Sequence, residues 1–319
     1  MAACICRPSK ASSPRKPCGL SAVGWRPSVL PIKGVRLLSA LAALGALVLA
    51  TPQPQAAEGD GGITAQPGTL RIAVYNDYPP YSYNGKGIDV DLAQAVAKEL
   101  GLKADIAWFN ADEDMNDDLR NMVWKGHYLG NRPGDLMMHV PYDERLAKAN
   151  SQVRIFAPYT VETIAVARDP QRIPKKVVGS AAVALEVFTR EKIGVELTTL
   201  SDAFLLSALN GRLREQVVHY KSVPLAVKGM QAGEVAAVMG PRAELEAALK
   251  TLDTPSRFQL DAVKMPELKV DNWALGMAVK SDNAKLAETV SHALSKLQKE
   301  GEVKRIFANY GITLQLPGE

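Results

Sequence analysis

Cysteine is scarce in this chain and confined to its first residues. All three cysteines (Cys4, Cys6 and Cys18) precede an apolar run at residues 37–50. The rest of the chain therefore has no thiol nucleophile, no disulfide framework and no cysteine metal site. Because no cysteine follows the apolar run, a lipid-anchored lipoprotein is not expected either.

Signatures of catalysis are also missing. The sequence contains no G-x-S-x-G, Walker loop, G-x-G-x-x-G or H-E-x-x-H motif. Its four histidines are scattered, and His127 and His139 flank one predicted loop. These two are either hydrogen-bonded polar residues, which we favour, or a metal pair. We therefore expect no enzyme, no metal and no cofactor.

Positive charge is concentrated at the N-terminus. Seven of the 38 basic residues and none of the 34 acidic residues lie in residues 1–57, which leaves the remainder a net charge of −3. A near-neutral body gives no indication of nucleic-acid binding.

The expected oligomeric state of the protein is a monomer.

The only long apolar run is short for a membrane span. Residues 37–50 (LLSALAALGALVLA) fall below the about 20 residues that a spanning helix needs. Lys33 and Arg36 precede the run and small residues follow it, as in a secretory signal peptide. Residues 1–57 are therefore predicted to be a signal peptide, and residues 58–68, rich in Pro, Gly, Gln and Ala, a linker.

Two details of this leader stay open. Cleavage after Ala57 is favoured over cleavage after Ala50, and an uncleaved anchor is the alternative. The region before Lys33 is long, so a translation start downstream of Met1 is the other open point.

The stretch from Leu70 to Leu102 organises the chain. Alternating apolar residues predict a strand from Leu70, followed by the loop Y-P-P-Y that ends at Tyr81 and by a helix that Asp89 can cap. The loop follows the carboxyl end of a strand, where open α/β sheets bind ligands.

These residues resemble a known family. The motif Y-P-P-Y-S-Y, then G-I-D-V-D-L-A-x-A-V-A-K-E-L-G, is similar to the opening of periplasmic solute-binding proteins of family 3. The C-terminal segment L-S-K-L-Q-K-E-G-E-V-K-R-I-F-A-N-Y-G-I is similar too, so the resemblance spans about residues 69–312. It implies an α/β, two-lobed type II periplasmic binding protein fold with two crossover strands, APYTVETIAVARD and DNWALGMAVKSDN. It places lobe 1 in residues 69–163 plus 266–319, lobe 2 in residues 164–265, and the protein in the periplasm.

The same resemblance implies ligand-binding residues. Arg145 matches the family arginine that grips a ligand carboxylate, and His139 and Tyr142 lie in the turn before it. Tyr81 matches an aromatic residue that stacks on the ligand. A surface ion pair for Arg145 and packing for Tyr81 are the alternatives. In lobe 2, Ser180 precedes a helix whose exposed amides could meet an anion.

One slot departs from the family pattern. Ordinary amino-acid binders place an aspartate after the glycine of a buried strand, where it takes the ligand's α-ammonium. Here that slot is Pro241, and the adjacent Arg242 would repel an ammonium. A bound solute is therefore expected to be an anion or carboxylate without a free α-amine. Both residues are included among the candidate ligand-binding positions.

The turn Gly240-Pro241, the insertion K-G-H-Y-L-G-N and the turn H-V-P-Y-D resemble a subgroup associated with quinoprotein (PQQ) alcohol dehydrogenases, which includes the J protein of methanol oxidation. This implies a non-catalytic accessory factor whose partner is a periplasmic quinoprotein dehydrogenase or its cytochrome. The alternative is a substrate-binding receptor of an ABC importer, with an ABC permease as partner and a small carboxylate or amino-acid-like solute as ligand. A dehydratase of the cyclohexadienyl type is the third and least favoured hypothesis.

Two local patterns complete the predictions. Asp112, Asp114 and Asn116 fall at the first three ligand positions of a calcium loop, but the sixth and twelfth positions do not fit. A helix cap at Asp112 or Asp114 is favoured instead. Further along, a strand is predicted over Glu196–Leu200, followed by a helix that Ser201 or Asp202 can cap.

Overall fold

The computed structural model describes residues 62–318. The predicted signal peptide, its cleavage site, the alternative start and linker residues 58–61 lie outside the described residues. Within residues 62–318 no helix is both long enough and apolar enough to cross a membrane.

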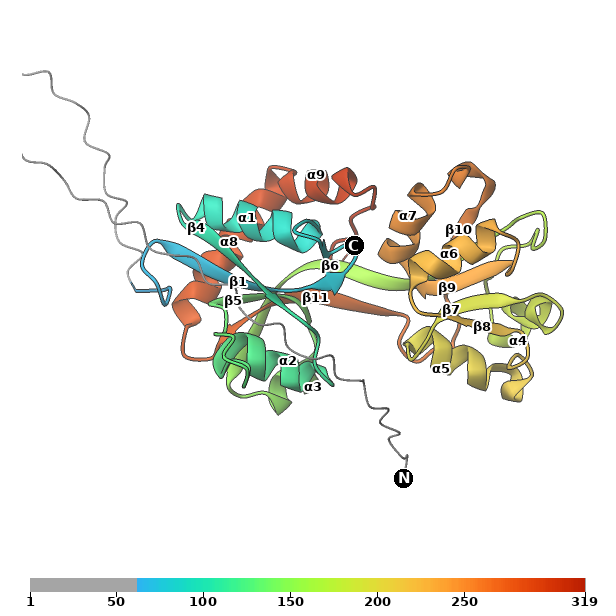
Figure 1. The fold of residues 1–319 in the computed structure, drawn as a ribbon, viewed down its shortest axis with the longest axis horizontal. Coiled ribbons are helices and arrows are strands. Elements are labelled where there is room, and N and C mark those ends of the chain that lie inside the picture. The colour runs from blue at the N-terminus through green and yellow to red at the C-terminus, as the bar shows by residue number, and fades with distance from the viewer. Residues whose placement is uncertain (1–61, 319) are drawn as a thin grey trace, which may run out of the picture. The chain divides into compact units, whose positions relative to one another are not determined.

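Strands and helices alternate along the described chain (Figure 1). The strands are β1 (Thr69–Tyr75), β2 (Asp77–Tyr78), β3 (Ser82–Tyr83), β4 (Lys103–Phe109), β5 (Leu136–Pro141), β6 (Val153–Arg168), β7 (Ile193–Glu196), β8 (Val217–Tyr220), β9 (Ala237–Pro241), β10 (Gln259–Ala262) and β11 (Asn272–Lys280). The α-helices are α1 (Ile88–Glu99), α2 (Met115–Leu119), α3 (Glu144–Ala149), α4 (Ala181–Ala184), α5 (Leu200–Ser207), α6 (Val223–Gln231), α7 (Arg242–Lys250), α8 (Ala284–Lys299) and α9 (Glu302–Asn309). Shorter helical turns are η1 (Arg120–Trp124), η2 (Glu186–Thr189), η3 (Ala208–Gly211) and η4 (Pro255–Arg257).

The first lobe is built on β1, which pairs in parallel with β4 and β5. Successive side chains of a strand point to opposite faces, so β1 serves two cores. Leu70, Ile72 and Val74 pack with α1, α8 and α9, whereas Ala73 and Tyr75 pack with α2 and η1. Figure 1 shows these two sets of helices on opposite faces of the sheet.

Helix α1 begins differently from the prediction. Its N-cap is Gly87 at φ 139°, and a Cβ there would lie 2.0 Å from the carbonyl oxygen of Tyr81. Only glycine fits this close backbone approach. The prediction that Asp89 caps the helix is wrong, because its carboxylate accepts hydrogen bonds from the Tyr159 hydroxyl at 2.6 Å and from Nδ1 of His139 at 3.0 Å.

Strand β6 links the two lobes. Its residues 153–163 pair with β11, and its residues 164–168 pair with β9 and β10. The eight strands of the main path therefore follow the order β4-β1-β5-β11-β6-β9-β7-β8. The predicted two-lobed fold with two crossover strands is confirmed, with β6 and β11 as the crossovers. The predicted lobe boundaries stay a prediction.

In the second lobe β7 pairs in parallel with both β8 and β9. The carboxyl ends of β7, β8 and β9 lead into α5, α6 and α7. Because parallel strands end at one edge of a sheet, the three connecting turns meet there.

The acidic run forms a helix cap. Asp114 is the N-cap of α2, and its carboxylate accepts from the amides of Asn116 and Asp117. Its neighbour Asp112 accepts from the side chain of Asn121 instead. Across residues 62–318 no group of three His, Cys, Asp or Glu residues is arranged to hold a metal ion. The capping interpretation is confirmed for Asp114.

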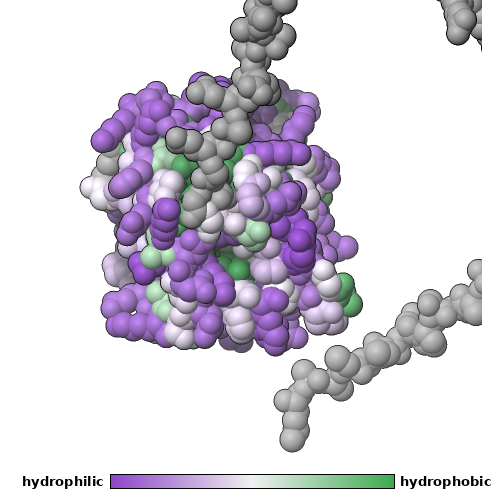
Figure 2. Space-filling model, turned by 90° about the vertical axis from the view of Figure 1, so that its left-hand side faces the viewer, coloured by the Kyte–Doolittle hydropathy of each residue, from purple (hydrophilic) through white to green (hydrophobic). Residues whose placement is uncertain are grey.

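The surface of the first lobe is largely polar on the side drawn in Figure 2. Hydrophilic side chains predominate there outside the grey trace, and apolar residues form small scattered groups. Such scattered apolar residues are normal for a protein surface and need no partner.

Candidate functional site

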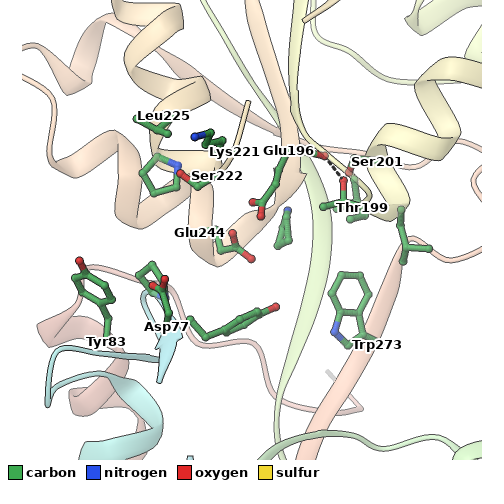
Figure 3. Close-up of a pocket in the computed structure, with 16 residues that line it drawn as sticks. Asp77, Tyr83, Glu196, Thr199, Ser201, Lys221, Ser222, Leu225, Glu244 and Trp273 are labelled. Carbon is green, nitrogen blue, oxygen red and sulfur yellow. Dashed lines mark hydrogen bonds between the residues drawn. The ribbon is translucent and has the colours of Figure 1, made fainter. Parts of the chain in front are cut away.

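A cavity of about 780 Å³ is lined by residues from both lobes (Figure 3). The first lobe contributes Asp77 and Tyr78 of β2, and crossover strand β11 contributes Trp273. The second lobe contributes the turns after β7, β8 and β9. Its principal lining residues are Glu196, Thr199, Ser201, Lys221, Ser222, Pro241 and Glu244.

The turn after β7 is held by its own hydrogen bonds. Thr199, the N-cap of α5, donates from Oγ1 to the carbonyl oxygen of Glu196 at 2.8 Å and accepts from the amide of Asp202 at 3.2 Å. The predicted cap at Ser201 or Asp202 is therefore wrong, because Thr199 caps the helix and the helix begins at Leu200. The turn therefore fixes Ser201 in the first turn of α5, against the cavity.

Two carboxylates face each other across the cavity. Figure 3 shows the side chains of Glu196 and Glu244 directed toward one another. Glu196 accepts one hydrogen bond, from the amide of Val223 at 3.1 Å. Within residues 62–318 the carboxylate of Glu244 has no hydrogen bond or ion pair.

Burial makes ionisation of both carboxylates unfavourable. It raises the pKa of Glu196. It raises the pKa of Glu244 well above its usual range, and the negative charges of Glu196 and Glu162 add to the effect. Removal from water and like charges both disfavour the carboxylate form. The cavity thus presents carboxylate oxygens that lack a cationic partner.

We expect Glu244→Gln to stabilise the ligand-free protein at neutral pH. A raised folded-state pKa means that the stability contributed by the protonated group is lost as pH rises from about 4.3, the unfolded value, through the folded pKa. Glutamine avoids this loss, so the variant should gain about 0.5–2 kcal/mol above the folded pKa and nothing below about pH 4.

The measurement is Tm from pH 4 to 9 without added solute. Glu288→Gln, on the exposed face of α8, is the matched control and should change Tm little at any pH. A Glu244→Gln protein less stable than the parent at pH 8 would contradict the prediction.

A second cavity of about 400 Å³ adjoins the first and shares Asp77, Tyr78 and Trp273 with it. His139 lines this smaller cavity. Its ring lies 4.3 Å from the ring of Tyr81 and 4.7 Å from that of Tyr78, centroid to centroid. The aromatic loop and His139 therefore form one packed group, in which Tyr78 lines both cavities.

The seven predicted ligand-binding residues are dispersed. Pro241 lines the larger cavity and His139 the smaller. Tyr81 is 2% exposed and donates its hydroxyl hydrogen to Glu162 at 2.7 Å. Arg242 is buried, pairs with Glu246 at 2.7 Å and donates to the carbonyl oxygen of Thr313 at 2.8 Å. The Tyr81 hydroxyl and two of the three guanidinium nitrogens of Arg242 thus bind other residues of the protein.

The other three predicted residues line neither cavity. Arg145 is exposed on α3 and makes no hydrogen bond or ion pair with another residue in the described part of the chain. Tyr142 is 53% exposed just before that helix. Ser180 is the N-cap of α4 without a side-chain capping bond.

Sequence reasoning missed Glu196, Ser201 and Glu244 as site residues. The predicted strand over Glu196–Leu200 is wrong, because β7 ends at Glu196. With the correct strand end, Glu196 is a polar residue at the carboxyl end of a buried strand, which is the position where open α/β sheets bind ligands. Glu244 was concealed in a helix of mixed charge, where nothing in the sequence distinguishes an inward-facing glutamate from an exposed one.

The architecture and the cavity between the lobes define the class of the protein: it has the type II periplasmic binding protein fold. Residues 70–128 match the sequence profile of bacterial extracellular solute-binding proteins, family 3. The solved structure of an ancestral cationic amino acid solute binding protein is similar, with a TM-score of 0.57 and 20% identity over 76% of this chain and 95% of that one.

Two curated relatives share sequence with the chain. The L-cystine-binding protein TcyJ of Escherichia coli strain K12 is 24% identical over 249 residues, which cover 75% of this chain and 81% of the relative. The cyclohexadienyl dehydratase of Pseudomonas aeruginosa is 33% identical over 115 residues, 33% of this chain and 42% of that protein. The chain is thus similar to solute-binding proteins of family 3 over residues 70–128 and to a solute binding protein in its fold.

Proposed function

We propose that this protein is a periplasmic substrate-binding receptor of an ABC importer for a small amino-acid-like solute. The observation that carries the proposal is the cavity of about 780 Å³, lined by polar side chains from both lobes at the carboxyl ends of β7, β8 and β9. Solute sites on open α/β sheets lie at such edges. Its partner in the membrane would be an ABC permease.

Contacts at the crossover support a receptor that responds to its ligand. Glu162 of β6 accepts from the Tyr81 hydroxyl in the first lobe and from the amide of Ala243 in α7, at 2.7 and 3.3 Å. One buried carboxylate therefore links the aromatic loop of the first lobe to α7 of the second. A solute that joined the two walls would favour closure about β6 and β11.

The test is to purify the protein gently from its native periplasm and identify retained solutes by native mass spectrometry. Ser222→Trp, which places a large ring in the cavity wall, should abolish retention and ligand-induced stabilisation. Ser295→Trp, on an exposed position of α8, is the control and should retain solute. A parent protein that carries no solute, and gains no Tm from periplasmic extract, would contradict the proposal.

An accessory role beside a quinoprotein dehydrogenase is a second candidate, favoured by the inserted loop. Tyr128 and Leu129 are 85% and 77% exposed there, and two backbone hydrogen bonds between His127 and the residues Gly130 and Asn131 close the turn that presents them. The similar proteins fit the receptor better. Loss of dehydrogenase or cytochrome co-purification in Tyr128→Ala/Leu129→Ala would favour the accessory role, and absence of either partner from the parent preparation would count against it.

A further inference from the structure

We propose that Glu196 and Glu244 form an ammonium-binding site, so that the solute is recognised through a protonated amine. This inference rests on the proposed receptor function and names its ligand class. It replaces the expectation, drawn from Pro241 and Arg242, of a solute without a free amine.

The two carboxylates lack a counter-ion. Lys221 lines the same cavity but forms no ion pair with either glutamate, and Arg242 turns away to Glu246 and Thr313. Partly buried carboxylates without a cationic partner are unfavourable, and a bound ammonium would supply that partner. An ammonium has three donors and no acceptor, which suits two facing carboxylates.

Helix N-termini at the cavity favour a group of the opposite charge, an anion. The N-termini of α5, α6 and α7 all border the cavity, and such ends favour anions. The amide of Val223 in α6 already binds Glu196, and the amide of Ala243 in α7 already binds Glu162. At the N-terminus of α5 the cap residue Thr199 accepts from the amide of Asp202, so Ser201 in the first turn of that helix is the group that we assign to a polar or anionic part of the solute.

Ser201 supplies an independent sign of a ligand at that third terminus. It is 1% exposed and lines the cavity, yet its Oγ has no hydrogen-bond partner among residues 62–318. Buried hydroxyl groups are normally hydrogen-bonded, so an unpaired one at a cavity wall indicates a partner that binds from the cavity. A solute with an ammonium between the two glutamates and a second polar group at Ser201 would supply both the missing counter-ion and the missing hydrogen-bond partner.

The geometry also explains why Pro241 does not exclude an amine. Residue 241 caps α7, whereas Glu244 lies in the first turn of that helix and points into the same cavity. The acidic residue therefore stands at position 244, in the first turn of α7, and not at position 241.

The test uses the twenty common amino acids together with a matched five-carbon series: pentane-1,5-diamine, 5-aminopentanoate and glutarate. Each compound is screened at 10 mM by its effect on Tm, and Kd is measured for every hit and its N-acetyl derivative. We expect the hits to carry an ammonium and glutarate to have no effect. N-acetylation should weaken binding about 10–100-fold, the loss of a charge-assisted hydrogen bond.

The same measurements on the double variant Glu196→Gln/Glu244→Gln test whether these two glutamates bind the ammonium. This variant should bind the amine about 10–100-fold more weakly and no longer distinguish it from its N-acetyl derivative. Asp271→Asn, a carboxylate outside the cavity lining, is the control and should keep the full difference. Glutarate binding, equal affinity for the acetylated compound, an unchanged difference in the double variant or no hit at 10 mM would each overturn the inference. A retained native solute without an amine would overturn it while leaving the receptor function intact.

Discussion

Replacing Arg168 with alanine is expected to lower the free energy of unfolding by about 3–5 kcal/mol, and Tm by roughly 6–20 °C. Arg168 is 2% exposed at the end of β6. It donates to Asp261 at 2.6 Å, to Gln259 at 2.6 Å and to the carbonyl oxygen of Ile173 at 2.7 Å. The truncation leaves a buried carboxylate without its counter-ion and opens a void, so two large penalties add.

Chemical denaturation would measure this loss, and the same strand offers a control. Arg154 is exposed near the other end of β6 and forms no ion pair with a described residue, so Arg154→Ala should cost less than about 0.5 kcal/mol. Arg168→Met/Asp261→Leu should recover part of the stability, because apolar groups replace both charges. An Arg168→Ala protein as stable as Arg154→Ala would contradict the prediction.

Asp89→Ala is expected to cost about 2–6 kcal/mol, because it leaves two buried donors without an acceptor at about 1–3 kcal/mol each. Asp89 is 1% exposed and accepts from Tyr159 and His139. The substitution should also release the His139 ring from the aromatic group that lines the smaller cavity. Denaturation measures the stability, and the histidine side-chain NMR signals report the ring.

Asp89→Asn separates the hydrogen bonds from the space. Asparagine keeps the size of the side chain and one acceptor oxygen for Tyr159, so it should cost less than half as much as alanine. Equal losses in the two variants would show that the pairing with Tyr159 contributes little.

Much of the fold could be read from local pattern. The alternation from Leu70 to Val74 and the turn at Gly87 give a buried strand and a helix, because each depends on residues close in sequence. The cap at Asp114 was predictable for the same reason. Asp89 was not, since its partners Tyr159 and His139 lie 70 and 50 residues away.

The candidate site was harder to predict because it is assembled across the chain. Asp77, Glu196, Glu244 and Trp273 come from four separate elements, β2, β7, α7 and β11, and only the tertiary structure brings them around one cavity. Matching single positions to the family pattern favoured Arg145 and Tyr81. The structure leaves Arg145 exposed and engages Tyr81 with Glu162.

The sequence by itself determined the class of fold, because its motifs resemble those of periplasmic solute-binding proteins, while hydrophobic periodicity and turn residues set single strands and helices locally. It also determined that residue 241 carries no charge for an ammonium. Only the tertiary structure decided that Glu196 and Glu244 face each other without a cation and that Ser201 is buried beside them. The charge of a cavity depends on which side chains point inward and which of them are already paired, and both follow from packing between distant segments.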